Sequence, residues 1–480
     1  MQLAATTFPH VHVRRRLSRK PLALAIAFAF GTVVMPAAHA ATLTVSNTND
    51  AGAGSLRGQI AAAVSGDTIN FSVTGAITLT TGEIAFAKSL LVSGPGSGSL
   101  NLTKSGASSR IFNITGTPTV TISGLTFSGA GGPGIGGGGA ITKAGGSLTI
   151  QNSVFTGNSA DGGGGALYNQ KGPLNIQSSV FTNNTVGAVN DGASDGGALY
   201  ISTGNVTIQD STISGNRCGN DGGGIYHSQG TLTIINSTIS NNQAQYGSAI
   251  SRFCGTCNLA YSNNATTITN STITGNSIFA ARVSSTQGGA LFFDAATHTI
   301  SNSTIANNSA PEAVGGNIQI TGGAILNLRS TIVSGGTDVS GNRDIFVNTA
   351  STINSSDSLV QNPGGFLNGT VTNTITGQSP LLAALANNGG PTQTMALQGG
   401  SPAIDKGANP SALAFDQRGT PFVRSIGQTD IGAFEVQGGP PPPPPSVAQI
   451  PTLSQWGLGV MSVLMAGWAL VTGFGRRRRS

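Results

Sequence analysis

Two aspartates, Asp195 and Asp221, occupy equivalent points of a repeated motif, each directly before a pair of glycines. If the motif recurs once per structural coil, the two carboxylates lie one coil apart, at about 5 Å. Carboxylates that close repel each other unless a cation or hydrogen-bond donors intervene, and Ca²⁺ accepts such oxygen ligands. A calcium site is one interpretation. Ordinary Asp-Gly turn chemistry is the other, because only two ligands are in view.

Aromatic residues follow the same motif in four of its copies, at Tyr168, Tyr200, Tyr226 and Phe292. The residue before each ring is Leu or Ile, and consecutive side chains of a strand point to opposite faces. If the aliphatic residues point inward, the rings form an outward stripe. Exposed flat rings suit stacking against sugar faces, so these four residues are our ligand-binding candidates. The alternative is a structural ladder in which the rings protect only each other.

The three cysteines are Cys218, Cys254 and Cys257. No strand–helix–strand pattern surrounds the Cys254–Cys257 pair to support a redox motif, and a zinc site with His227 lacks a fourth ligand. Repeat alignment places Cys218 a strand's length from the other two, beyond the ~7 Å that a disulfide bridges. We therefore predict a local Cys254–Cys257 disulfide and a free Cys218.

The other charged residues do not gather into an acid–base site. Residues 139–330 hold seven acids, mostly one per repeat and mostly in turns. A polysaccharide lyase or glycoside hydrolase needs a dense carboxylate cluster, or a basic residue beside the acid. We assign no catalytic residue and favour a binding protein, with an enzyme on the same scaffold as the alternative.

A polar heptapeptide recurs through the middle of the chain. Its copies are NSVFTGN (152–158), SSVFTNN (178–184), DSTISGN (210–216), NSTISNN (236–242), NSTITGN (270–276) and NSTIANN (302–308). Each copy ends in an asparagine, namely Asn158, Asn184, Asn216, Asn242, Asn276 and Asn308. Asn tolerates the left-handed conformation of a sharp turn, and its amide both donates and accepts. We predict that these asparagines occupy one corner of successive coils and form a buried ladder.

Two further elements complete each repeat: a glycine-rich companion such as GGAL (164–167), and a short alternating segment such as PLNIQSS (173–179). One repeat therefore contains three short strands separated by Gly, Asn and Asp turns. A period of 20–50 residues indicates a solenoid or a propeller, and three strands per repeat favour the solenoid. We predict an all-β fold, a single-stranded right-handed parallel β-helix similar to the pectin-lyase-like solenoids, over residues 67–330.

The end of a solenoid exposes its core and requires a cap. Residues 41–66 contain a short helical pattern from Ser55 to Val64, with Leu56, Ile60 and Val64 on one face. We predict that this helix is the N-terminal cap.

Both ends of the chain have the composition of targeting segments. Residues 1–40 run from basic to apolar and end in Ala38-His39-Ala40, the order of a secretory signal peptide cleaved after Ala40. At the other end, a proline-rich linker (438–449) precedes an apolar run (458–474) and four arginines. The run has the minimum length for a membrane-spanning helix, and the arginines would stay in the cytoplasm.

Residues 450–480 resemble the IPTL-CTERM sorting signal of Gram-negative bacteria. The resemblance is carried by Ile450, Pro451, Thr452, Leu453, Ser454, Trp456 and Gly457, followed by one apolar span and a basic end. It implies that an exosortase-type protease removes the tail and that the protein reaches the cell surface. Residues 458–474 would then anchor the chain in the inner membrane only transiently.

Residues 331–437 resemble a choice-of-anchor Q domain, a C-terminal module that follows β-helices. The likeness is carried by SPLLAALANNGGPTQTMAL (379–397), GSPAIDKGAN (400–409), FDQRGTPF (415–422) and DIGAFE (430–435). The GGAL and FTGN elements are also similar to repeats of the polymorphic outer-membrane proteins, an adhesin family.

The charge balance excludes a nucleic-acid partner. The chain has 23 Lys and Arg against 17 Asp and Glu. The leader holds five of these cations and the tail four, with no acid in either, so the mature region has 14 cations against 17 acids, or −3. It therefore lacks the excess of basic residues that nucleic acid requires. Charged residues are only 8%, which leaves a nearly neutral surface of Asn, Ser, Thr and Gly.

We expect an exported, adhesin-like β-helix at the cell surface, the outer membrane or outside the cell. Its expected partner is a glycan or a host or neighbouring cell, with no cofactor apart from the Ca²⁺ considered above. The alternatives are a polysaccharide lyase or glycoside hydrolase, and a passive surface-layer component.

Overall fold

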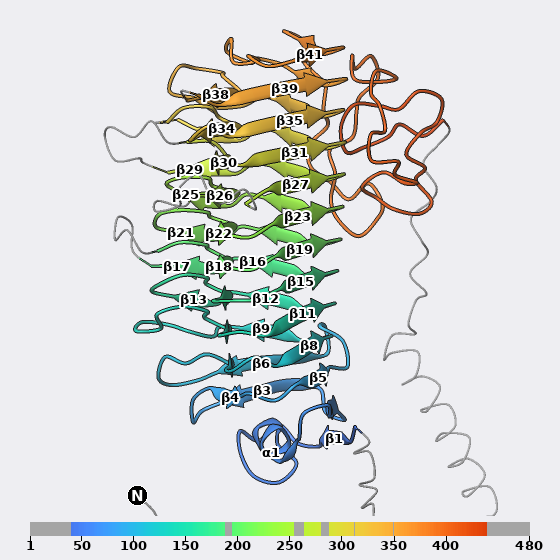
Figure 1. Ribbon diagram of the computed structural model, residues 1–480. Helices are drawn as coiled ribbons and strands as arrows, with labels where there is room; N and C mark the ends of the chain where they lie inside the picture. Colours follow the sequence, from blue (N-terminus) through green and yellow to red (C-terminus); the bar gives the residue numbers. More distant parts are fainter. Residues whose placement is uncertain are drawn as a thin grey trace, which may run out of the picture. The chain divides into compact units, whose positions relative to one another are not determined.

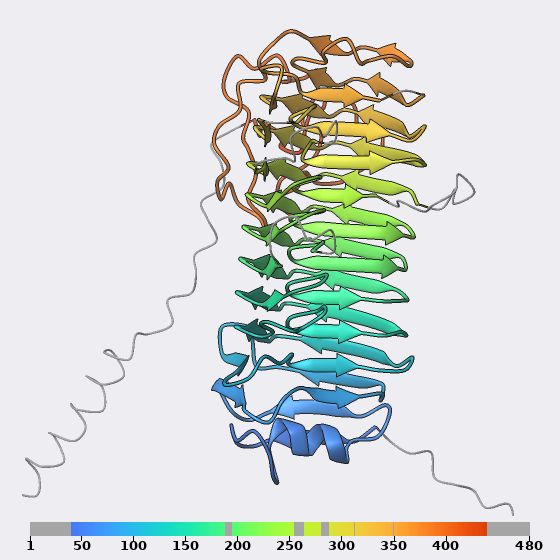
Figure 2. The same ribbon diagram turned by 90° about the vertical axis from the view of Figure 1, so that its left-hand side faces the viewer.

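The computed structural model describes residues 40–187, 194–253, 264–279, 288–311, 313–348 and 350–438. From Thr42 to Thr376 the described chain winds into a right-handed parallel β-solenoid, which confirms the predicted fold class (Figures 1 and 2). The predicted leader (1–40, apart from Ala40), most of the linker (438–449) and the sorting signal (450–480) lie outside the described residues.

Four parallel sheets run along the described solenoid, and we name them A to D. Sheet A comprises β1 (Thr42–Val45), β2 (Thr68–Phe71), β5 (Leu90–Ser93), β8 (Thr119–Ser123), β11 (Ser147–Gln151), β15 (Leu174–Gln177), β19 (Val206–Gln209), β23 (Leu232–Ile235), β27 (Thr266–Thr269), β31 (Thr297–Ser301), β35 (Ile325–Arg329), β39 (Thr352–Ser356) and β41 (Val371–Thr372). Sheet B comprises β3 (Gly75–Leu79), β6 (Leu100–Lys104), β9 (Thr126–Ser128), β12 (Val154–Thr156), β16 (Val180–Thr182), β20 (Thr212–Ser214), β24 (Thr238–Ser240), β28 (Thr272–Thr274), β32 (Thr304–Ala306), β36 (Ile332–Ser334), β40 (Leu359–Val360) and β42 (Ile375–Thr376).

Sheets C and D lie on the side where the chain returns to sheet A, and sheet D is limited to the coils from β13 to β37. Sheet C comprises β4 (Ile84–Phe86), β7 (Phe112–Ile114), β10 (Ile141–Lys143), β14 (Leu167–Asn169), β18 (Leu199–Thr203), β22 (Ile225–Gln229), β26 (Ile250–Arg252), β30 (Leu291–Asp294), β34 (Ile318–Thr321) and β38 (Ile345–Val347). Sheet D comprises β13 (Ser159–Ala160), β17 (Thr185–Val186), β21 (Arg217–Cys218), β25 (Gln243–Ala244), β29 (Ser277–Ile278), β33 (Ser309–Ala310) and β37 (Thr337–Asp338). The sequence predicted three strands per coil. The two-residue strands of sheet D are a fourth, too short to show alternation.

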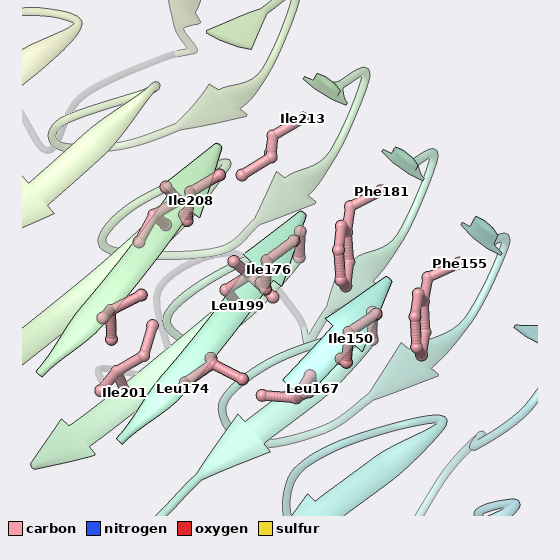
Figure 3. Close-up of a cluster of buried hydrophobic side chains, with 14 of the residues drawn as sticks. Ile150, Phe155, Leu167, Leu174, Ile176, Phe181, Leu199, Ile201, Ile208 and Ile213 are labelled. Atoms are coloured by element: carbon pink, nitrogen blue, oxygen red, sulfur yellow. The ribbon is translucent and has the colours of Figure 1, made fainter. Parts of the chain in front are cut away.

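The core consists of apolar side chains stacked at equivalent positions of successive coils. In sheet B, Phe155 pairs in register with Phe181, and their rings stack 4.6 Å apart and nearly parallel. Ile213 continues the same column, and all three are fully buried (Figure 3). Since a single coil cannot bury its own apolar face, stacking of coils supplies the hydrophobic driving force.

The heptapeptide forms the two corners on either side of sheet B. Its first residue, for example Asn236 (φ 49°), has a left-handed conformation, which Asn, Asp and Ser tolerate better than bulky residues. Its sixth residue, for example Asn241 (φ 57°) or Gly275 (φ 68°), is left-handed as well. The prediction gave this conformation to the seventh residue and was wrong by one position, because the ladder asparagine follows the turn.

The final asparagines form the predicted ladder. Nδ2 of Asn242 donates to Oδ1 of Asn276 at 2.9 Å and to the Ile213 carbonyl of the preceding coil at 3.0 Å. Oδ1 of Asn242 accepts from Nδ2 and the backbone N–H of Asn216, both at 2.9 Å. The same pattern links the fully buried Asn158, Asn184, Asn216, Asn242, Asn276 and Asn308. Each amide is satisfied only if the coils on both sides are in place.

The second residue of the heptapeptide builds another ladder, which the sequence did not reveal. The backbone N–H of Ser211 donates to Oγ of Ser237 in the next coil at 3.2 Å, and Ser211 Oγ donates to the Gln209 carbonyl at 2.7 Å. Equivalent bonds link Ser153 to Ser179 and Ser271 to Ser303. These serines are buried, so the small polar residue satisfies the backbone of the corner.

The solenoid is longer than predicted at both ends. β1 already pairs with β2 in sheet A, ahead of helix α1 (Leu56–Ala62). The helix begins at the N-cap Ser55 and buries Leu56 and Ile60, but Val64 lies beyond it and is 59% exposed, contrary to prediction. At the other end, strands continue to Thr376, so the predicted boundary at residue 330 is too early. The repeat pattern fades there while the backbone pairing persists.

Residues 379–437 have few regular elements and lie beside the coils (Figure 1). The buried Gln417 is the centre of the contact. Its Nε2 donates to Oγ1 of Thr238 at 3.0 Å, and its Oε1 accepts from Oγ1 of Thr272 at 2.6 Å. The Ala433 N–H donates to Oγ1 of Thr304, the next threonine of the same outward column. The third residue of the later heptapeptides therefore holds the C-terminal region on the solenoid.

We predict that Asn242→Ala lowers the free energy of unfolding by about 1–3 kcal/mol, because the buried N–H groups of Asn216 lose their acceptor and the Ile213 carbonyl loses its donor. Urea unfolding followed by circular dichroism measures this loss. Asn175→Ala, at an exposed position of sheet A, is the matched control and should change stability little. Equal effects of the two substitutions would contradict a ladder whose bonds stabilise the fold.

Candidate functional site

The tyrosines lie in one outward column of sheet C. Tyr168 pairs in register with Tyr200, and Tyr200 with Tyr226. The ring centroids of Tyr168 and Tyr200 are 4.9 Å apart with planes at 78°, and Tyr200 stacks on Tyr226 at 4.9 Å and 27°. Tyr168 and Tyr200 are half-buried, so part of each ring faces outward.

The stripe is shorter than predicted. Tyr226 is only 9% exposed, and its hydroxyl donates to the Phe253 carbonyl at 2.9 Å. Phe292 is buried beside the Phe253 ring, and Ser251 separates it from Tyr226 in the column. Tyr226 and Phe292 thus occupy outward strand positions but are buried, and both contact Phe253. Only Tyr168 and Tyr200 remain as surface candidates.

Glycines of the adjacent loops allow the rings to lie against the backbone. A Cβ on Gly137 would come within 2.7 Å of the Tyr168 ring, and one on Gly163 within 2.3 Å of the Tyr200 ring. Both distances are far below van der Waals contact. The glycine runs before β10 and β14 therefore fix where the two rings sit, and any side chain there would displace them.

Asp195 and Asp221 lie together beside the tyrosine column, one coil apart as predicted. Oδ1 of Asp195 accepts from the Asn220 side chain at 2.8 Å and from the Asp221 N–H at 3.1 Å. The Asn220 amide also donates to Oδ2 of Asp221 at 3.2 Å, and Ser251 Oγ donates to Oδ1 of Asp221 at 3.1 Å. One asparagine amide thus bridges the two carboxyl groups, in the place where the sequence suggested a cation.

Burial dominates the electrostatics of this pair. Together with the charge of Asp195, it raises the pKa of Asp221 to about 8, against the opposing hydrogen bond from Ser251. The described residues include no group of three or more His, Cys, Asp and Glu side chains that could hold a metal ion. A calcium ion therefore stays a prediction with two ligands, while a carboxyl group that keeps its proton at neutral pH is a potential acid.

Cys218 lies in the protein interior, in contact with the backbone of Asp221. It is fully buried and free, and its Sγ donates to the Asp221 carbonyl at 3.2 Å. Burial raises the pKa of its thiol well above the ordinary value, so it is a poor nucleophile at neutral pH. Cys254 and Cys257 lie outside the described residues, and their disulfide stays a prediction.

Sheet C also contains an inward row of polar residues that the sequence did not reveal: Lys143, Asn169, His227 and Arg252. Nζ of Lys143 donates to Oδ1 of Asn169 at 2.7 Å and to the Lys171 carbonyl, and Nη2 of Arg252 donates to the Gly230 carbonyl at 2.7 Å. These donors satisfy carbonyls of the turns between sheets C and A. All four occupy the third position of their strand, and this shared position is the only feature of the sequence from which the row could have been predicted.

His227, which the sequence analysis considered as a zinc ligand, belongs to this interior row, and Cys254 and Cys257 lie outside the described residues. Its Nε2 lies 2.9 Å from the Gly204 carbonyl and 2.8 Å from the Gln229 carbonyl. Burial and the charge of Arg252 hold its pKa well below the usual range. The ring is a structural group of the interior.

Comparison with protein families finds two regions. Residues 448–479 match the IPTL-CTERM motif, and residues 110–278 match the right-handed β-helix region. The motif indicates an exported protein that is sorted to the cell surface and processed by a sorting protease. A choice-of-anchor Q region is not among the matches and stays a prediction.

Among solved structures, the chain is similar to pectate lyase Pel9A, at 16% identity over 83% of this chain and 97% of the lyase, with a TM-score of 0.47. It is also similar to the A-module of mannuronan C-5 epimerase AlgE6 from Azotobacter vinelandii, at 14% identity over 70% of this chain and 99% of that module, with a TM-score of 0.43. No curated protein matches the chain. The described residues include no helix long and apolar enough to cross a membrane, and residues 458–474 lie outside them.

The raised pKa of Asp221 predicts a pH-dependent stability. The folded value of about 8 exceeds the ordinary 3.8, so the folded protein binds this proton more tightly than the unfolded chain. Stability from this group is complete below pH 3.8 and is lost as the pH rises to about 8. Asp221→Asn keeps the shape but cannot ionise, so the stability of the variant should fall less than that of the native protein between pH 5 and 8. Urea unfolding at several pH values in this range measures the free energy of unfolding of both proteins. An equal pH dependence of the two would contradict the prediction.

Proposed function

We propose that this surface-sorted β-helix binds a glycan along the outer face of sheet C without turning it over. The half-exposed rings of Tyr168 and Tyr200 carry the proposal. They are aligned by strand register and set by the glycines beneath them. Flat aromatic surfaces held in place lose little conformational freedom when a sugar face stacks on them.

The chemical surroundings of the stripe favour a neutral or weakly charged polymer. The described surface is rich in Asn, Ser, Thr and Gly, and charged residues make up only 8% of the chain. Repeated coils also present similar positions at about 4.8 Å intervals, which suits weak contacts repeated along a chain. Recognition of a host or neighbouring cell would follow if such a glycan covers its surface.

A second candidate function, cleavage of the bound glycan, is favoured by one observation. The pKa of Asp221, about 8, would let its carboxyl group donate a proton at neutral pH. Against it, both oxygens of Asp221 already accept hydrogen bonds and the residue is only 7% exposed. A glycosidase also needs a second carboxyl group across the scissile bond, whereas Asp195 is tied to the same asparagine. Binding therefore ranks above cleavage.

We predict that the purified protein binds members of a glycan array, and that Tyr168→Ala with Tyr200→Ala weakens this binding at least tenfold by removing the stacking surface. Leu91→Ala removes an exposed apolar side chain from sheet A and is the matched control. Reducing-sugar and unsaturated-product assays on the same glycans should remain silent. Product formation that disappears in Asp221→Asn would show that the protein is an enzyme. Unchanged glycan binding in the tyrosine variant would show that Tyr168 and Tyr200 do not form the binding site.

For sorting, we predict that the protein recovered from the cell surface lacks the four terminal arginines. Its new C-terminus should lie near residues 450–457, because the motif directs proteolytic removal of the tail. Intact mass measurement of the surface and inner-membrane fractions gives the answer. A full-length chain that is stable in the inner membrane would mean that residues 458–474 act as a permanent anchor.

A further inference from the structure

A recess of about 340 Å³ opens beside the first strands of sheet C. Its walls are the segment from Leu79 to Glu83, which leads into β4, and the segment from Ser105 to Arg110, which leads into β7, with Ile135 on a third side. The volume is at the lower end of the range for small-molecule sites, about 300–1,000 Å³. It is therefore suited to one small ring rather than to an extended ligand.

The first wall is held rigidly by the N-terminal segment. Oδ2 of Asp50 accepts from the N–H and hydroxyl of both Thr80 and Thr81, at 2.7–3.0 Å. Arg57 pairs with Asp50 at 2.8 Å and donates to the carbonyls of Gly82 and Glu83 at 2.6 and 2.9 Å. These bonds and the cation lower the pKa of Asp50 below its usual value, against the opposing effect of burial, so they persist at neutral pH. The wall is thus preorganised before any ligand arrives.

Glu83 and Arg110 form a polar fork at the recess. Nη1 of Arg110 donates to Oε2 of Glu83 at 3.0 Å, and Nδ2 of Asn113 donates to Oε1 of Glu83 at 2.6 Å. Nη2 of Arg110 has no acceptor in the described part of the chain. The side chains are 21% and 29% exposed for Arg110 and Glu83, so both reach the opening. The fork offers N–H donors beside carboxylate acceptors with spare lone pairs.

The recess lies close to the tyrosine stripe. Nε of Arg110 donates to the Gly137 carbonyl at 2.8 Å, and Gly137 lies directly against the Tyr168 ring. Asn113 also belongs to the outward column of sheet C, two coils before Tyr168. A chain lying on Tyr168 and Tyr200 would therefore reach the fork within two coils, or about 10 Å.

We propose that this recess is a terminal subsite that holds one neutral sugar ring by two adjacent hydroxyl groups. One hydroxyl donates to Glu83 and the other accepts from Nη2 of Arg110, while the half-buried Ile135 faces the C–H side of the ring. The fork has no net charge, so an anionic ligand would meet the Glu83 carboxylate and a cationic one the Arg110 guanidinium. This subsite rests on the proposed function, because it names the end of the same glycan-binding face.

The test is ligand-observed NMR titration of the whole mature protein with four probes: glucose, galactose, mannose and glucuronate. At least one neutral hexose should bind more tightly than glucuronate. Glu83→Gln removes the charged acceptor and should weaken that binding about tenfold or more. Ala107→Trp fills the recess from an exposed lining position and should abolish it without touching the fork. The matched control, Ala384→Trp at an exposed position of the C-terminal region, should bind normally.

The outcomes separate this inference from the proposed function. If array glycans lose binding in the tyrosine variant but hexose binding is absent or unchanged by Ala107→Trp, the subsite is wrong and the stripe stands. If hexoses bind in the recess but the tyrosine variant keeps its glycans, the stripe is wrong and the subsite stands. Preference for glucuronate over every neutral hexose would overturn the neutral-ring assignment. Melting temperatures equal to that of the native protein are the folding control for Glu83→Gln.

Discussion

Hydrogen bonds that run along the solenoid axis tie each coil to the next, and the rest of the structure depends on them. Backbone bonds between parallel strands supply most of them, and the Asn and Ser ladders supply them at the corners, where strand pairing stops. A corner that contained only backbone groups would bury unsatisfied N–H and C=O groups. The asparagine column ends where Asn317 donates to the carboxylate of Asp344 at 2.9 Å. Both oxygens of Asp344 accept hydrogen bonds, from Asn317, Gly336 and Asn362, so this side chain ends the series of donating amides.

The ladders and the apolar core restrict the residue types at the corners and at inward positions. Outward positions can vary, and they give the solenoid surfaces of different composition. The third residue of the heptapeptide is Val in two early copies, at Val154 and Val180, and both are partly exposed. In later copies it is Thr, and Thr238 and Thr272 bond to Gln417 of the C-terminal region. Thr212 of the intermediate copy is also Thr but stays partly exposed, so contact with the C-terminal region, and not the residue type alone, marks the covered coils.

The C-terminal region and the tyrosine stripe occupy different sheets and different coils of the solenoid. The region docks along the corner between sheets A and B and on sheet B, through Asn270, Thr272 and Thr304 among others. Tyr168 and Tyr200 project from sheet C. Since the sorting motif follows the C-terminal region in sequence, the segment nearest the sorting signal and the proposed recognition face do not compete for surface.

The sequence by itself determined the fold class, the tail motif and the ladder asparagines. All three are periodic or local signals, and an element that recurs once per coil must stack on its own copy. It could not decide burial: Tyr226 and Phe292 occupy outward strand positions, yet both are buried and both contact Phe253. Nor could it show that Asn220 bridges Asp195 and Asp221, or that Glu83 and Arg110 meet across a recess. Such contacts join residues of different coils and loops that share no period, so only the folded chain brings them together.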